Sequence, residues 1–133
     1  MATIQWFPGH MSKARRQVQE SIKFVDFVTI LVDARLPLSS QNPMLTKIVG
    51  DKPKLLILNK ADLADPNLTK EWQAYFESQG IKTLAINSKE QSAVKKVTEA
   101  AKKLMADKLA RQRERGIQIE TLRTMIIGIP NAG

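Results

Sequence analysis

The sequence predicts an α/β protein in three layers, with a parallel sheet of about four strands and helices on both faces. Short apolar runs of strand length alternate along the chain with segments whose apolar residues recur at helical spacing. Strands that are separated by helices require crossover connections, and right-handed crossovers give a parallel sheet that helices cover on both sides. A length of 133 residues without internal repeats indicates one domain.

The first half of the chain contains two expected helices and two expected strands. Apolar residues at helical spacing predict a helix over residues 11–22. The continuous, β-branched run FVTILV predicts a strand over residues 27–32 that is buried on both faces. Asn42 and Pro43 begin a short helix, and the run KLLIL predicts a second buried strand over residues 54–58.

The second half of the chain continues this alternation. Asp65 followed by Pro66 predicts a helix N-terminus, because Asp accepts from free backbone N–H groups and Pro fits the first turn. Gly80 is expected to end this helix. Strands are expected over residues 83–86 and 124–129, with a long helix between them. The residues expected to face the core are Leu68, Trp72, Tyr75 and Phe76 in the first helix, and Val94, Val97, Ala101, Leu104, Met105 and Leu109 in the second.

The composition restricts the class of protein. The chain has no Cys and only 1 His, which excludes disulfides, thiolate metal sites and His-cluster metal sites. The 21 basic residues outnumber the 13 acidic ones, and this net charge of +8 favours an anionic partner such as nucleic acid. The N-terminal residues include Pro, Gly and charges where a signal peptide has an apolar stretch, and the apolar runs are too short to span a bilayer. We therefore expect a soluble, cytoplasmic protein without a membrane partner.

The motif Asn59-Lys60-Ala61-Asp62 directly follows an expected strand. The Asp62 carboxylate can accept two parallel hydrogen bonds from the N1–H and N2 amino groups of guanine, whereas adenine lacks the N2 amine. A site built for such donors discriminates by roughly 10⁴-fold. Asn59 would bond the N7 side of the base or link neighbouring loops, and the Lys60 stem would lie over the purine. A polar turn without a ligand is the alternative.

Two further loops follow expected strands. Asn87 and Ser88 come after residues 83–86, where backbone N–H groups can reach guanine O6 and Ser88 shapes the turn. Capping of the next helix is the alternative there. Residues 128–133, GIPNAG, make a Gly-x-x-x-x-Gly turn in which consecutive N–H groups can point at phosphate oxygens. A complete phosphate loop needs Lys and then Ser or Thr next, so by itself this pattern indicates only a turn.

The order of these motifs is reversed relative to Ras-like GTPases, in which the phosphate loop comes first and Asn-Lys-x-Asp comes late. In this order, and in the stretches IQWFPGHMSKARRQ, LVDARLPLSSQNPM and MIIGIPNAG, the chain resembles the circularly permuted GTPases, in particular bacterial ribosome biogenesis GTPases. The resemblance implies a Ras-like P-loop GTPase fold, GTP or GDP and Mg²⁺ as ligands, and the pre-ribosomal large subunit with its rRNA as partner.

The resemblance also implies roles for individual residues. Asn131 would help to bind a potassium ion, which adds positive charge where the transition state needs it. His10 would position the attacking water by accepting a hydrogen bond as a neutral imidazole. The alternative is that His10 caps or orients the first helix near Trp6 and Phe7. The residues implied to bind GTP are Asn59, Lys60, Ala61, Asp62, Asn87 and Ser88 around the base, and Pro130, Asn131, Ala132 and Gly133 in the phosphate loop.

The chain departs from the family pattern in the parts that it lacks. These are the phosphate-loop Lys-Ser/Thr, the switch regions, the Mg²⁺-contacting Asp-x-x-Gly and the C-terminal helical domain, so the Mg²⁺ ligands are absent from this chain. We expect residues 1–133 to be the N-terminal part of a circularly permuted GTPase domain, ending inside the phosphate-binding loop. The intact protein is expected to be a GTPase and this fragment alone to be inactive. The strand ending at Ile127 would then be an exposed apolar edge, which favours self-association.

A non-enzymatic, basic RNA-binding α/β module is the alternative function. Residues 95–115 contain eight basic and three acidic residues, and the first helix adds Lys13, Arg15 and Arg16. Such surfaces grip phosphates without reading bases. This alternative leaves the Asn-Lys-x-Asp motif and the glycine turn unexplained, and it can coexist with GTP binding if the basic helices hold rRNA.

Overall fold

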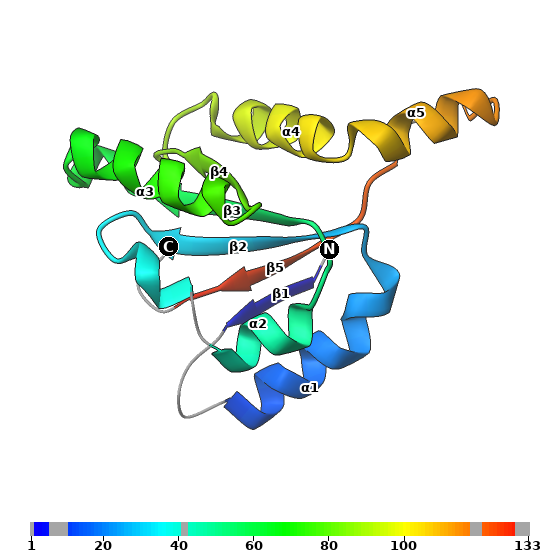
Figure 1. Ribbon diagram of the computed structural model, residues 1–133, viewed down its shortest axis with the longest axis horizontal. Coiled ribbons are helices and arrows are strands. Elements are labelled where there is room, and N and C mark those ends of the chain that lie inside the picture. Colours follow the sequence, from blue (N-terminus) through cyan, green and yellow to red (C-terminus); the bar gives the residue numbers. More distant parts are fainter. Residues whose placement is uncertain (1, 6–10, 41–42, 118–120, 130–133) are drawn as a thin grey trace.

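A five-stranded parallel sheet forms the centre of the protein (Figure 1). The computed structural model describes residues 2–5, 11–40, 43–117 and 121–129. The strand order is β1-β5-β2-β3-β4, and every neighbouring pair is parallel. The predicted α/β class is confirmed, with one strand more than expected. The strands are β1 (Ala2–Gln5), β2 (Phe27–Asp33), β3 (Lys54–Asn59), β4 (Lys82–Ala85) and β5 (Thr124–Gly128).

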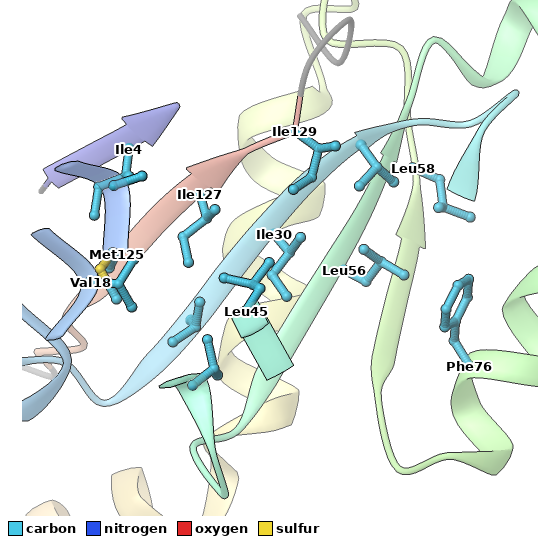
Figure 2. Close-up of a cluster of buried hydrophobic side chains, with 14 of the residues drawn as sticks. Ile4, Val18, Ile30, Leu45, Leu56, Leu58, Phe76, Met125, Ile127 and Ile129 are labelled. Carbon is cyan, nitrogen blue, oxygen red and sulfur yellow. The ribbon is translucent and has the colours of Figure 1, made fainter. Parts of the chain in front are cut away.

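Helices cover both faces of the sheet and complete the predicted three layers. On one face, Val18 of α1, Leu45 of α2 and Phe76 of α3 pack on Ile30 and Leu56 of the sheet (Figure 2). On the other face, α4 and α5 form a separate layer (Figure 1). The helices are α1 (Met11–Ser21), α2 (Pro43–Val49), α3 (Pro66–Ser78), α4 (Ala93–Leu104) and α5 (Ala106–Glu114), with short 3-10 turns η2 (Ile22–Phe24), η3 (Pro37–Ser40) and η4 (Ala61–Leu63).

The central strands are apolar on both faces because each face has its own core. Along β2, Val28 and Ile30 point to the α1–α3 layer, while Phe27 belongs to the core under α4. Along β3, Leu56 and Leu55 divide between the two faces in the same way. Burial of one such aliphatic or aromatic side chain stabilises the fold by about 1.5–3 kcal/mol. The continuous apolar runs of the sequence are therefore what a doubly covered sheet needs.

The prediction that the strand ending at Ile127 is an exposed edge is wrong. β1 pairs with β5 from Ala2–Met125 to Gln5–Gly128, so β5 lies inside the sheet between β1 and β2. Ile127 is fully buried. The self-association that was expected through this edge loses its physical basis, because the backbone groups of β5 already have partners on both sides.

Two predicted helix faces are only partly correct. In α3, Phe76 is fully buried but Leu68 and Tyr75 are exposed, because α3 packs mainly on β4 at the edge of the sheet and only a narrow stripe is covered. The predicted long helix is divided at Met105 into α4 and α5. Val94 is 77% exposed, at the rim of a cavity between α4 and the sheet.

The predicted start and end of α3 are confirmed. The Asp65 side chain accepts from the backbone N–H groups of Asn67 at 2.8 Å and Leu68 at 3.3 Å, and Pro66 occupies the first helical position. After the helix, Gly80 adopts φ +80°, a conformation that side chains with a Cβ rarely take. These two signals fix α3 directly after the Asn-Lys-x-Asp motif.

Candidate functional site

The direction in which the chain adds strands to the sheet reverses beside β2. From β2 the chain proceeds to β3 and β4, with α2 and α3 on one face of the sheet. It then returns, with α4 and α5 on the other face, to place β5 on the opposite side of β2 (Figure 1). In parallel α/β sheets, ligands bind beyond the carboxyl ends of the strands at such a reversal. The loops after β2, β3 and β4 and the exit from β5 therefore define the candidate site.

Asn59 is buried and connects two loops of this site. Its side chain ends β3 and is only 2% exposed. Asn59 Oδ1 accepts from the backbone N–H of Ser88 at 2.9 Å, and the N–H of Ala61 donates to the Ile86 carbonyl at 3.0 Å. These bonds hold the loop after β3 against the loop after β4. Of the two roles considered for Asn59, the linking of neighbouring loops is the one that the structure shows.

Lys60 has an uncommon backbone conformation. Its φ of 60° and ψ of 34° lie in the left-handed region, which residues other than glycine rarely adopt. The N–H of Leu63 donates to the Lys60 carbonyl at 2.9 Å, which begins the short turn η4. Asp62 lies within η4 and is exposed to solvent. The chain therefore passes within this turn from the buried side chain of Asn59 to the exposed carboxylate of Asp62.

Asn87, rather than Ser88, shapes the loop after β4. Asn87 Oδ1 accepts from the N–H of Lys89 at 3.1 Å, and its carbonyl accepts from the N–H of Glu90 at 2.9 Å. The N–H of Ser88 already donates to Asn59. The backbone donors that we expected to meet guanine O6 thus have protein partners here, and a bound base would share one of these bonds.

Asp33 ends β2 and Arg35 follows it, and both are site residues to which no role was assigned from the sequence. Asp33 is 2% exposed, and its Oδ1 accepts from the Arg35 backbone N–H at 2.9 Å and from Nε at 3.0 Å. Its Oδ2 accepts from the terminal guanidinium nitrogen at 2.7 Å and lies 3.7 Å from Lys60 Nζ. The Arg35 side chain lowers the pKa of Asp33 to about 2 despite burial, and Asp33 in turn raises the pKa of Arg35. The motif DAR within LVDARLPLSSQNPM was the available signal.

The remaining predicted site residues lie outside the described part of the chain. These residues are His10, Pro130, Asn131, Ala132 and Gly133. The approach to the glycine turn is described as far as Ile129, whose N–H donates to the Leu31 carbonyl at 2.9 Å. Among the described residues, no group of three acidic, His or Cys side chains can hold a metal ion.

A separate cavity of about 530 Å³ lies between the sheet and the α4–α5 layer. Its lining is largely apolar and includes Leu31, Ile57 and Ile126, with Ser88 as one of few polar members. A nucleotide phosphate needs a cluster of donors, whereas this lining is mainly aliphatic and Lys102 is the one cation among its described residues. We therefore place the candidate site at the loops and not in this cavity.

The exposed cations lie on both outer layers. Of the eight basic residues in the 95–115 segment, Lys108 is half-buried and pairs with Asp26, whereas the other seven are exposed. Lys13, Arg15 and Arg16 are exposed on α1, which belongs to the opposite layer (Figure 1). No helix in the described ranges is long and apolar enough to cross a membrane.

Comparison with known proteins shows relatives that match nearly the whole chain. The chain is 51% identical over 131 residues to ribosome biogenesis GTPase A of Bacillus pumilus, covering 98% of this chain and 46% of the relative. It is 37% identical over 130 residues to mitochondrial ribosome-associated GTPase 1 of Bos taurus, covering 97% of this chain and 38% of the relative. No protein-family model matches the chain.

Solved structures show the same fold. The GNP-bound YlqF of T. maritima matches with a TM-score of 0.61 and 27% identity, over 91% of this chain and 44% of YlqF. The chain thus spans about half the length of the relatives that it matches. By sequence and by fold, it belongs to the family of circularly permuted GTPases that includes ribosome biogenesis GTPase A.

Proposed function

We propose that the natural protein carrying this sequence binds and hydrolyses GTP as an assembly factor of the large ribosomal subunit. In this proposal, the 133 residues supply the guanine-reading loops and the start of the phosphate loop. The observation that carries it is the junction of the loops after β3 and β4 through Asn59 and Ser88, with Asp62 exposed beside it. The names of the relatives, which include ribosome biogenesis GTPase A, support the same activity and process.

Guanine selection is assigned to Asp62 and Lys60. The Asp62 carboxylate is open to solvent on a turn that two hydrogen bonds link to the loop after β4, so a base can reach it. It would accept from the N1–H and N2 amino groups of guanine, whereas adenine has no donor at either position. The Lys60 stem, which is 29% exposed, would lie over the purine face, and Asn59 would hold both loops at the spacing that one base requires.

Phosphate binding and hydrolysis are assigned to residues outside the described ranges. Residues 130–133 would turn backbone N–H groups toward the phosphates, and Asn131 would help to hold a potassium ion. His10 would orient the attacking water. GTP also requires Mg²⁺, which would neutralise charge on the phosphates and whose protein ligands would come from beyond residue 133. The position of β5 next to β2, across from β3 and β4, supports phosphates on one side of Asp33 and the base on the other.

A non-enzymatic RNA-binding function is the second candidate. The seven exposed cations of the 95–115 segment favour it, since such residues contact backbone phosphates irrespective of sequence. We propose that these cations hold rRNA while the loops bind the nucleotide. A cytoplasmic site of action stays a prediction, because some relatives carry mitochondrial names.

A nucleotide titration tests the proposal. The natural full-length chain and residues 1–133 are titrated with fluorescent GDP, with unlabelled GDP and ADP as competitors. We expect the full-length chain to prefer GDP by at least about 100-fold, because only guanine satisfies the Asp62 carboxylate. Equal and feeble binding of GDP and ADP to both chains would reject the GTPase and leave the RNA-binding module.

A further inference from the structure

Asp33 at the end of β2 and Arg35 just after it have no role in the function proposed above. Asp33 is nevertheless the most completely bonded carboxylate near the site. It is 2% exposed, it receives three hydrogen bonds from Arg35, and its Oδ2 faces Lys60 Nζ at 3.7 Å. A buried carboxylate with such an arrangement can either stabilise the local fold or fix the position of a neighbouring charge.

The position of Asp33 favours the second role. Asp33 and Asn59 are register partners at the carboxyl ends of β2 and β3, so Lys60 begins one residue beyond the pair. The N–H of Ala34 donates to the Asn59 carbonyl at 2.8 Å, which keeps the two chain ends together. The Lys60 ammonium therefore reaches Asp33 across neighbouring strands, at the point where the base-reading turn starts.

We propose that Asp33 is a positioning residue for the nucleotide site, which holds the Lys60 side chain in the orientation that covers the guanine ring, with Arg35 fixing the carboxylate. This inference rests on the function proposed above and deepens it. Lys60 has four rotatable side-chain bonds and a left-handed backbone, so the site needs a second contact to keep one conformation. Asp33 supplies that contact.

Arg35 prevents Asp33 from adopting other orientations. Bonds to both carboxylate oxygens from one guanidinium, together with the backbone N–H, fix the plane of the carboxylate. The Arg35 side chain is itself half-exposed, so it does not need to be part of the core. Asp33, Arg35 and Lys60 together carry one net positive charge, which leaves the site attractive to an anionic nucleotide.

A double-mutant cycle tests whether Asp33 acts through Lys60. Asp33→Asn removes the charge at nearly constant shape, and Lys60→Met removes the ammonium while it keeps most of the stem. In the natural full-length protein, we expect each single variant to raise the Kd for fluorescent GDP by about tenfold. We expect the double variant to bind no more weakly than the weaker of the two single variants, because both remove the same contact.

A matched control lies at the other end of β2. Asp26→Asn is the same chemical change, at a carboxylate that pairs with Lys108 and accepts from the Arg123 N–H at 2.7 Å. Since Asp26 precedes β2 and Asp33 ends it, we expect the control to leave the Kd for GDP within about twofold. Loss of binding in the control by the same factor would show a general effect on the fold and would reject the positioning role.

Two outcomes of the cycle overturn the inference. One is an unchanged Kd in Asp33→Asn, and the other is a loss of the same factor in the Lys60→Met background as in the parent. If Asp33→Asn fails to fold by circular dichroism, Arg35→Met replaces it in the cycle, with an expected loss of about threefold that vanishes in Lys60→Met. An unmutated protein that does not prefer GDP over ADP would instead reject the proposed function itself, so the two failures are distinguishable.

Discussion

An aspartate lies at each end of strand β2, and the two aspartates make different contacts. At the amino end, Asp26 accepts from the Arg123 N–H and pairs with Lys108 of α5, which joins β2 to the start of β5 and to the outer helix layer. At the carboxyl end, Asp33 joins β2 to Arg35 and to Lys60, on the loop that carries the candidate site. Asp26 thus links elements of the fold at the amino end of β2, whereas Asp33 positions a binding loop at the carboxyl end.

This difference follows from the architecture of parallel sheets. All strands point the same way, so their carboxyl ends and the loops that follow gather at one edge. The loops at this edge lead from strands into helices and are where ligands bind, whereas the amino edge carries the connections that lead from helices back into strands. We therefore expect substitutions of the candidate site residues at the carboxyl edge to change nucleotide binding, and substitutions at the amino edge to change stability alone.

The largest expected effect is at Asp62. Asp62→Asn removes the acceptor pair for guanine, so the Kd for GDP should rise by at least about 100-fold. Xanthine carries a carbonyl in place of the N2 amine, and the new amide can donate to it, so binding of xanthosine diphosphate should improve. Competition titrations with both nucleotides on the parent and variant measure this exchange.

The control for this exchange is Asp51→Asn, an exposed carboxylate before β3 at the amino edge. It should leave the preference for GDP unchanged. A variant at Asp62 that retains parental affinity for GDP would show that the exposed turn η4 does not read the base. Substitutions at the two edges of the sheet would then not differ in their effect on GDP binding at this position.

A second effect, on stability and binding together, is expected at Asn59. Asn59→Ala leaves the Ser88 N–H without its acceptor in a part-buried position, which should lower the free energy of unfolding by about 1–3 kcal/mol. Affinity for GDP should fall as well, since the loops after β3 and β4 lose their link. Urea unfolding and GDP titration of the same preparation measure both quantities.

Asn67→Ala serves as the comparison, because Asn67 is an exposed side chain on α3. It should alter neither quantity by more than about 0.5 kcal/mol. If Asn59→Ala weakened GDP binding with no loss of stability, the structural link between the loops would be unimportant and direct contact of Asn59 with the base would explain the loss.

Much of this architecture could be predicted from the sequence, because a doubly covered strand leaves a clear apolar run. The runs over residues 27–32 and 54–58 became β2 and β3, and Asp65 with Pro66 and Gly80 marked α3 correctly. These signals are local. They depend on a residue and its immediate neighbours in the chain.

The features that escaped prediction depend on pairing between distant segments. β1 has four residues, too few to show a period, and its partner is about 120 residues away in β5. The role of Asp33 depends on its register with Asn59, which local sequence does not encode. The choice between two roles for Asn59 likewise required the position of Ser88. The exposure of Val94 reflects an open cavity, which no helical pattern reveals.

A third effect is expected in acid, where the carboxylate at the carboxyl end of β2 becomes protonated. The pKa of Asp33 is lowered to about 2 from its ordinary value of 3.8, chiefly by the Arg35 hydrogen bond. A carboxyl whose folded pKa is depressed adds stability above its unfolded pKa and loses it as the pH falls toward the folded value. The stability that Asp33→Asn removes should thus be about 1–2 kcal/mol near neutral pH and should shrink between about pH 4 and pH 2.

Urea unfolding of the parent and Asp33→Asn at several pH values measures this difference. The two unfolding free energies should converge as the pH approaches 2, since Asp33 is then becoming protonated in both states. A difference between parent and variant that stays constant from pH 7 to pH 2 would mean that the charge of Asp33 contributes no stability, and its role would then rest on hydrogen-bonding shape alone.

The smallest effect is expected at Asp65. At this position of the carboxyl edge, we expect the side chain to contribute to stability and not to nucleotide binding. Asp65 lies three positions after Asp62, but its side chain caps α3 through the N–H groups of Asn67 and Leu68. Asp65→Ala should lower the free energy of unfolding by about 1 kcal/mol, the usual cost of losing a helix cap, while Asp65→Ser should restore most of it. Because α3 packs mainly on β4 and makes fewer contacts with the base-reading turn η4, the Kd for GDP should stay at the parental value in both variants. A clear loss of GDP affinity in Asp65→Ala, with affinity recovered in Asp65→Ser, would instead show that the start of α3 holds η4 in place and that stability and positioning are coupled at this edge.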